Sequence, residues 1–112
     1  MQELVKRLRR FAEERDWEQF HSPKNLAMAL SVEVAEIVEH FQWLTEAESR
    51  GLGEDKRAAL ADEIGDVMIY LVNLSDKLGI DPLRAASEKL GKNEKKYPAG
   101  LVKGKSQKYT EY

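Results

Sequence analysis

Two pairs of carboxylates could do chemistry in this sequence of 112 residues. Glu33 and Glu36 form a Glu-x-x-Glu pair, and after a gap of 26 residues Glu63 and Asp66 form a Glu-x-x-Asp pair. Residues three positions apart lie on one face of a helix, so the two side chains of each pair could close on one cation. If the two helices pack antiparallel through their apolar stripes, all four carboxylates converge near the core.

Such a cluster predicts a site for a divalent cation. Four like charges in a partly buried place repel one another and lose hydration, unless protons or cations neutralise them. The sequence has no cysteine, and neither acidic pair carries a histidine at its fourth position. Oxygen ligands favour Mg²⁺, with Mn²⁺ as the alternative, and Mg²⁺ leaves positions open for substrate phosphates. Glu33, Glu36, Glu63 and Asp66 are therefore candidate metal ligands and catalytic residues for phosphoryl transfer.

Two other interpretations of these acidic residues stay open. Acidic pairs at this spacing are common on solvated helix faces, where they bind nothing. A di-iron carboxylate site has similar geometry, but it uses Glu-x-x-His on two helices. Here the only such pair joins Glu18 to His21, just before Pro23, which disfavours iron. We expect His21 to form a hydrogen bond at the start of a helix and His40 to lie on a solvated flank.

Basic residues near the C-terminus could neutralise a phosphate chain. Lys92, Asn93 and Lys96 lie on one face of a predicted helix, together with Lys89. Lysine ammonium groups and an amide could hold phosphate oxygens there, and the amide could instead read a base edge. A solvated lysine face is the alternative interpretation.

Aromatic residues could bind a planar base. Trp17, Trp43 and Tyr70 are among the aromatic residues nearest the acidic pairs in the sequence. Tyr70 follows Asp66 by four positions and so points the same way on a helix. Rings of this kind stack on bases, although most aromatic residues at helical spacing simply pack in a core.

The elements that must position these residues are all helical. Apolar residues at helical spacing predict helices over residues 2–15, about 24–44 and about 82–96, and one with an apolar seam from Leu60 to Leu78. Ser22-Pro23 and Asp81-Pro82 are typical of helix starts, because each places a capping side chain before a proline. We expect a loop over residues 45–54 and an extended C-terminal tail over 97–112.

Composition predicts one all-α globular domain over residues 1–112, with 42% hydrophobic and 34% charged residues. The net charge of −2 and the lack of a dense basic stretch before the C-terminus disfavour binding of duplex nucleic acid. No apolar run reaches the length of a membrane span, which favours a cytoplasmic location. Residues 67–72 are apolar nearly all round, so a small four-helix monomer could not cover them and an oligomer is expected.

Longer blocks of the sequence resemble one family of nucleotide hydrolases. The order Glu33-x-x-Glu36 and then Glu63-x-x-Asp66 resembles the motif of the all-α nucleoside triphosphate pyrophosphohydrolases, the MazG-like superfamily. Further blocks are similar to its dCTP pyrophosphatase branch, namely residues 11–21, 25–26, 41–43, 66–72, 93–98 and 108–111. The resemblance covers nearly the whole chain.

This resemblance implies a homotetramer of four-helix protomers that bind Mg²⁺ through the four carboxylates. It implies hydrolysis of a nucleoside triphosphate, dCTP or a modified relative, to the monophosphate and pyrophosphate. Trp17, Trp43, Tyr70 and Asn93 match positions that contact the nucleotide, some of them across subunits. Leu8 departs from the branch, because vertebrate members carry a histidine there near the base. A house-cleaning enzyme of broad specificity and a non-catalytic nucleotide-binding oligomer are the alternatives.

Overall fold

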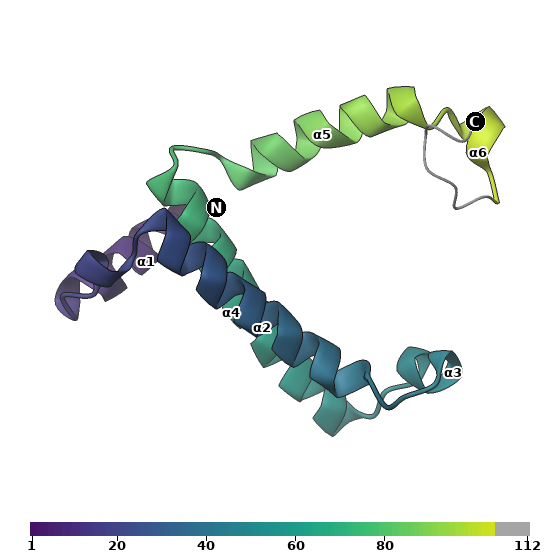
Figure 1. Cartoon of the computed structure of the whole chain (residues 1–112), viewed down its shortest axis with the longest axis horizontal. Coiled ribbons are helices and arrows are strands. Elements are labelled where there is room, and N and C mark those ends of the chain that lie inside the picture. Colours follow the sequence, from purple (N-terminus) through teal and green to yellow (C-terminus); the bar gives the residue numbers. More distant parts are fainter. Residues whose placement is uncertain (105–112) are drawn as a thin grey trace. The chain divides into compact units, whose positions relative to one another are not determined.

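The computed structural model describes residues 1–104, and these residues contain helices and no strand (Figure 1). In chain order the elements are α1 (Gln2–Glu14), the 3₁₀ helix η1 (Glu18–Phe20), α2 (Pro23–Phe41), α3 (Glu46–Arg50), α4 (Glu54–Lys77), α5 (Pro82–Lys96) and α6 (Ala99–Val102). The predicted all-α class is confirmed. The chain divides into two compact units, Met1–Ile80 and Asp81–Tyr112, so a single domain over 1–112 stays a prediction.

Helices α2 and α5 begin at Pro23 and Pro82, directly after the predicted capping residues Ser22 and Asp81. The Ser22 hydroxyl accepts the backbone N–H of Asn25 at 3.1 Å at the start of α2. At the start of α5, the Asp81 carboxylate accepts the backbone N–H groups of Leu83 and Arg84. Each side chain satisfies donors that the first helical turn leaves without partners.

The expected loop over 45–54 is wrong in part, because it contains the short helix α3. A capping box begins this helix: the Thr45 hydroxyl accepts the Glu48 N–H at 3.1 Å, and the Glu48 carboxylate accepts the Thr45 N–H at 2.9 Å. The pattern Thr-x-x-Glu in the sequence was the signal for it. Correspondingly, α2 ends at Phe41 rather than near residue 44.

The extended tail predicted over 97–112 is also wrong in part. The turn of helix α6 occupies Ala99–Val102 within the second unit. Residues 105–112 of the predicted tail lie outside the described part of the chain.

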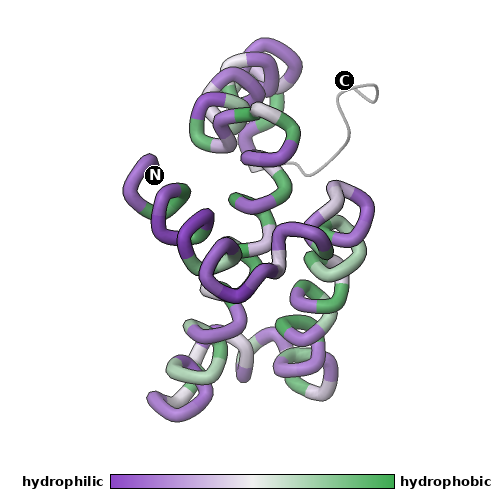
Figure 2. Tube along the Cα trace, turned by 90° about the vertical axis from the view of Figure 1, so that its left-hand side faces the viewer, coloured by the Kyte–Doolittle hydropathy of each residue, from purple (hydrophilic) through white to green (hydrophobic). Residues whose placement is uncertain are grey.

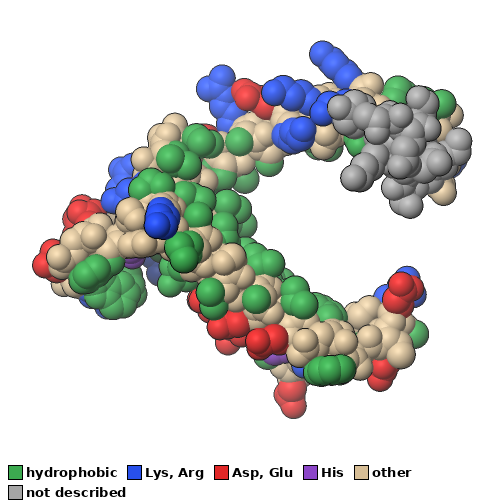
Figure 3. All heavy atoms as spheres, viewed as in Figure 1, with side chains coloured by type: hydrophobic (Ala, Val, Ile, Leu, Met, Phe, Trp, Pro, Cys, Tyr) green, Lys and Arg blue, Asp and Glu red, His purple; other side chains and the backbone are tan. Residues whose placement is uncertain are grey.

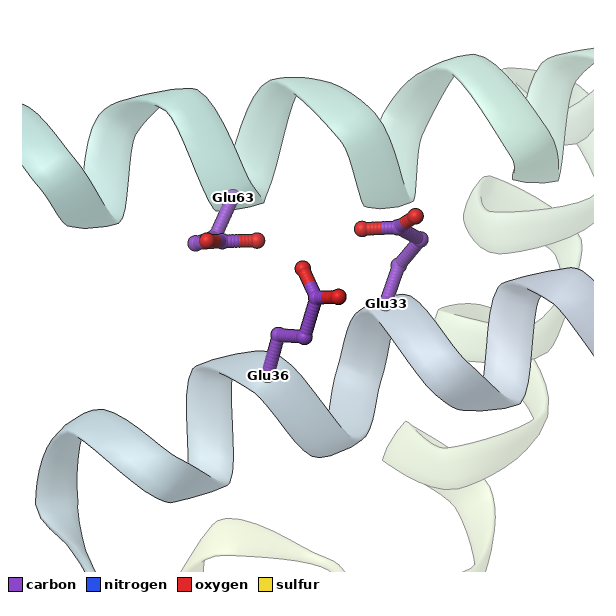
Figure 4. A group of neighbouring side chains, drawn as sticks. All are labelled: Glu33, Glu36 and Glu63. Carbon is purple, nitrogen blue, oxygen red and sulfur yellow. The ribbon is translucent and has the colours of Figure 1, made fainter.

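Helix α2 packs on α4, and α1 contacts α4 less extensively. The α2–α4 pair is antiparallel: Leu26 near the start of α2 shares a cleft with Tyr70, whereas Glu36 farther along α2 lies beside Glu63 (Figures 1 and 4). Leu26 on α2 and Val72 on α4 are each only 1% exposed. The antiparallel packing on which convergence of the carboxylates depends is therefore present.

The described residues bury few hydrophobic side chains. Only Ala12, Leu26, Leu60 and Val72 form a buried apolar core. Hydrophobic and hydrophilic residues alternate along the helices (Figure 2), and hydrophobic side chains reach the surface along α2 and α4 (Figure 3). The exposed hydrophobic residues on these two helices include Met28, Val32, Val34, Val38, Ile64, Met68 and Leu71. Within residues 1–104, no helix combines the length and apolar character that a membrane crossing needs.

One ion pair joins α1 to the end of α4. The Arg9 guanidinium donates two hydrogen bonds to the Asp76 carboxylate, at 2.6 and 2.9 Å. This bidentate geometry lowers the pKa of Asp76, first through the hydrogen bonds and also through the charge of Arg9. Because the first helix has few other contacts with α4, the pair should help fix its position.

We expect Arg9→Gln and Asp76→Asn each to lower the Tm by a few degrees, because each removes one partner of the pair. In the double variant the losses should be less than additive, and this coupling should shrink in about 1 M salt. Thermal unfolding followed by circular dichroism measures both effects. Strictly additive losses would show that the pair does not couple α1 to α4.

Candidate active site

Three carboxylates meet between α2 and α4. Each of Glu33, Glu36 and Glu63 offers one oxygen, and these oxygens lie within 4.8 Å of one another. Figure 4 shows Glu33 and Glu36 rising from α2 toward Glu63 on α4. We call this group the acidic cluster. Its geometry follows from the antiparallel pairing, because residues three apart on α2 both face the same turn of α4.

The acidic cluster is electrostatically unfavourable without a cation. One oxygen of Glu33 and one of Glu63 are buried and accept no hydrogen bond from the described residues. Burial is the largest cause that raises the pKa of Glu33, followed by the proximity of Glu36. For Glu63, hydrogen bonding with the neighbouring Glu36 carboxyl is the largest cause that raises the pKa, followed by burial. Protonation in the folded state therefore relieves the repulsion.

These residues fit a hard divalent cation. Among residues 1–104, one buried oxygen of Glu33 and one of Glu63 lack a hydrogen-bond donor, and a cation is a partner that such carboxylate oxygens can bind instead. Oxygens bound to one Mg²⁺ at about 2.1 Å lie at most about 4.2 Å apart, and the cluster oxygens already lie within 4.8 Å of one another, so at most a small closure is needed. All donors in the cluster are carboxylate oxygens, the ligands that Mg²⁺ and Mn²⁺ prefer.

Asp66, the fourth predicted ligand, lies beside the acidic cluster rather than within it. Its side chain is exposed and is not among the three donors within 4.8 Å. Its charge nevertheless contributes to the raised pKa of both Glu33 and Glu63. Asp66 therefore adds to the negative charge at the acidic cluster, and its role as a direct ligand stays a prediction.

His40 does not lie on a solvated flank, contrary to the expectation from the sequence. Its Nε2 lies 3.8 Å from Oε1 of Glu63, and both side chains are only 22% exposed. The nearby imidazole also lowers the pKa of Glu63, against the stronger causes that raise it. His40 follows Glu36 by four positions, so it shares that face of α2. This spacing was the signal that sequence reasoning overlooked.

A cleft lined by aromatic residues lies next to the acidic cluster along α4. Trp17, His21 and Tyr70 line two adjoining hollows of about 280 and 250 Å³. Asp66 lines the second hollow, so the cleft reaches the edge of the acidic site. The two hollows are otherwise lined by Leu8, Phe11, Phe20, Asn25, Leu26, Ala29, Ile69 and Asn73. We call this feature the aromatic cleft.

The end of α1 positions Trp17 in this cleft. Asp16 has a positive φ of 55°, so the chain reverses there and the Trp17 N–H donates to the Ala12 carbonyl at 2.9 Å. The Trp17 ring then packs edge-on against Phe11, with ring centroids 5.6 Å apart. The Arg15 guanidinium covers Phe11 at 3.7 Å. The ring of Trp17 is thus held by local contacts and is still 44% exposed.

The structure places Trp43, another predicted substrate-binding residue, outside this cleft. Trp43 follows α2, is 87% exposed and is absent from both hollows. Because a helix rises about 1.5 Å per residue, it lies roughly 20 Å along α2 from Ala29 in the cleft. Lys92, Asn93 and Lys96 share helix α5 in the second unit, and their contact with substrate stays a prediction.

Similarity to known proteins agrees with the geometry of the site. Residues 28–112 match the MazG-like family. The chain belongs to the MazG-like family. It is 48% identical over 103 residues to dCTP pyrophosphatase 1 of Homo sapiens, and 47% identical to dCTP pyrophosphatase 1 of Rattus norvegicus. Each alignment covers 90% of this MazG-like chain and 61% of the relative, so the chain spans less than two thirds of those proteins.

A solved structure shares both the fold and much of the sequence. The crystal structure of a pyrophosphatase from Archaeoglobus fulgidus superimposes with a TM-score of 0.83 at 44% identity. The match covers 88% of this MazG-like chain and 92% of the archaeal chain. This MazG-like chain therefore shares its helical architecture with a solved pyrophosphatase.

The acidic cluster should make the metal-free protein less stable as pH rises. Glu33 and Glu63 bind more protons when folded than when unfolded, because their folded pKa values exceed the ordinary 4.5. Stability should therefore fall as pH rises from about 4.5 through the raised values. Glu36→Gln removes the charge between them, so it should raise the Tm in EDTA at pH 8 and flatten this fall.

Glu39→Gln is the matched control, because Glu39 is exposed on the same helix and loses the same charge. It should leave the pH dependence of the Tm unchanged. If Glu36→Gln also leaves the pH dependence of the Tm unchanged, repulsion within the acidic cluster does not destabilise the folded protein.

Proposed function

We propose that this chain is a Mg²⁺-dependent nucleoside triphosphate pyrophosphohydrolase that acts on dCTP or a modified relative. The reaction consumes one water and yields the nucleoside monophosphate and pyrophosphate. The observation that carries this proposal is the 48% identity, over 90% of the chain, to a protein named dCTP pyrophosphatase 1. The acidic cluster and the adjoining aromatic cleft supply the two parts that such a substrate needs.

The carboxylates are proposed to hold the cation and to handle the attacking water. Glu33, Glu36 and Glu63, with Asp66 beside them, would hold Mg²⁺, which when bound neutralises phosphate charge and polarises the α-phosphoryl group. One of the α2 glutamates, Glu33 or Glu36, orients the water and accepts its proton as oxygen attacks the α-phosphorus. The bond from that phosphorus to the bridging oxygen breaks, and pyrophosphate leaves. The lysine residues of α5 are proposed to hold it.

The base is proposed to lie in the aromatic cleft. Tyr70 follows Glu63 by seven residues, which is about 10 Å along α4, or two helical turns. Asp66 lies between them and lines the cleft, so a nucleotide could place its base against Trp17 and Tyr70 with its phosphates at the acidic cluster. Stacking on such rings holds a base with little dependence on its identity, so specificity must come from polar groups in the cleft.

A homotetramer is proposed as the working assembly. The exposed apolar residues of α2 and α4 need cover that the described part of one chain does not supply. Trp43 lies too far along α2 to reach a base in the cleft of its own chain. It could contact a nucleotide held by another copy, which agrees with the contacts across subunits that the resemblance implies.

Two wider predictions from the sequence stay predictions. These are the cytoplasmic location and the lack of binding to duplex nucleic acid. The alternatives of a broad nucleotide specificity and of a non-catalytic nucleotide-binding oligomer are separated by the activity test below.

We expect the protein to release pyrophosphate from dCTP with Mg²⁺, and Glu36→Gln to lose at least about 100-fold in kcat for every nucleotide, roughly 3 kcal/mol. The loss should be the same for every base, because removing a ligand charge weakens the metal site that all nucleotides share. A coupled assay with inorganic pyrophosphatase, over a panel of nucleoside triphosphates, measures this. Glu39→Gln should retain full activity.

The panel distinguishes the alternatives. A similar kcat/KM for all bases would favour the broad enzyme. Binding of nucleotide without any turnover in Mg²⁺ or Mn²⁺ would leave only the non-catalytic oligomer.

We expect light scattering to report about four times the chain mass of 12.8 kDa.

If Trp43 acts across subunits, Trp43→Ala should raise KM, and co-refolding it with Glu36→Gln should restore part of the activity. Restoration occurs because some mixed sites then take Trp43 from one chain and an intact acidic cluster from another. A stable monomer would contradict the proposed assembly, and a tetramer without restoration would place both residues of each site in one chain.

A further inference from the structure

We propose that His40 is a positioning residue, which holds one oxygen of the Glu63 carboxylate so that the other faces a bound cation. The inference rests on the proposed metal site, and it adds a residue to which neither the family resemblance nor the comparisons assign a role. The two oxygens of Glu63 have different surroundings. Oε1 faces Nε2 of His40 at 3.8 Å, whereas Oε2 is buried and accepts no hydrogen bond among the described residues.

The different surroundings of the two Glu63 oxygens suit a metal ligand, because one oxygen could accept a hydrogen bond while the other binds the cation. A ligand that also accepts a hydrogen bond is fixed in orientation, and such outer partners commonly change metal affinity by about 10–100-fold. An imidazole N–H at 3.8 Å needs to move by less than 1 Å to donate to Oε1. Both side chains are only 22% exposed, so water competes little for this contact.

The geometry favours positioning over direct ligation by His40. The donors that lie within 4.8 Å of one another are the three glutamates, and the imidazole is not among them. Of the acidic cluster, His40 forms an ion-pair contact with Glu63 alone. Its position on α2, one turn beyond Glu36, places it at the end of the cluster rather than over its centre.

Binding of Mn²⁺ to the full chain, measured by calorimetry at pH 8, tests the role of His40. His40→Leu removes the N–H and retains an apolar side chain of similar bulk, so we expect the Kd for Mn²⁺ to rise about tenfold. His40→Gln places an amide N–H near the former Nε2 and should remain within about threefold of the wild type. His21→Leu, at the only other histidine of the chain, should bind Mn²⁺ as the wild type does.

The Tm in EDTA checks that a change in folding does not cause these effects. We expect similar values for the wild type, His40→Leu and His40→Gln, because the proposed role appears only when a cation binds. A tenfold weaker Mn²⁺ affinity in His40→Leu, with recovery in His40→Gln and unchanged metal-free Tm, would support positioning.

Three results would overturn the inference. The first is an unchanged Kd in His40→Leu when the wild type binds Mn²⁺, which leaves the proposed metal site intact. The second is a loss in His40→Gln that is much larger for Ni²⁺ than for Mn²⁺, because imidazole ligation favours Ni²⁺ and His40 would then be a direct ligand. The third is no binding of Mn²⁺ or Mg²⁺ to the wild type, which would also remove the proposed metal site.

Discussion

Repulsion among three carboxylates held between two helices is the constraint on which this protein depends. Glu33, Glu36 and Glu63 offer oxygens within 4.8 Å of one another, and two of their oxygens are buried with no hydrogen-bond donor among residues 1–104. Side chains on a mobile loop would move apart to regain water. Here two long helices, packed antiparallel against each other, hold them in place. The packing energy of the helix pair thus keeps the charges close, and a bound cation would turn this repulsion into attraction.

The same two helices explain why so little hydrophobic surface is buried within the described residues. A helix that carries a polar site on one face and apolar residues on others cannot cover all its apolar area with one neighbour. Residues such as Val38 on α2 and Ile64 on α4 are more than half exposed. Their apolar surface is a reason to expect further copies of the chain.

The acidic cluster and the aromatic cleft lie on successive turns of α4. Glu63 belongs to the acidic cluster, Asp66 lies at its edge and lines the aromatic cleft, and Tyr70 forms a wall of that cleft. A rigid helix fixes the separation of these groups, so a substrate that contacts both ends must have a matching length. His40 on α2 extends this arrangement, because it faces the carboxylate that a cation would share with α2.

The sequence by itself determined the features that depend on local spacing. Helical periodicity and the caps at Ser22 and Asp81 predicted the main helices, and the Glu-x-x-Glu and Glu-x-x-Asp pairs predicted which carboxylates share a face. Only the tertiary structure decided how α2 and α4 align, because that register depends on the packing of side chains far apart in the chain. The register brings three carboxylates together and leaves Asp66 at the edge. The same register places His40, which we expected on a solvated flank, beside Glu63. It also leaves Trp43 far from the cleft that Trp17 and Tyr70 line.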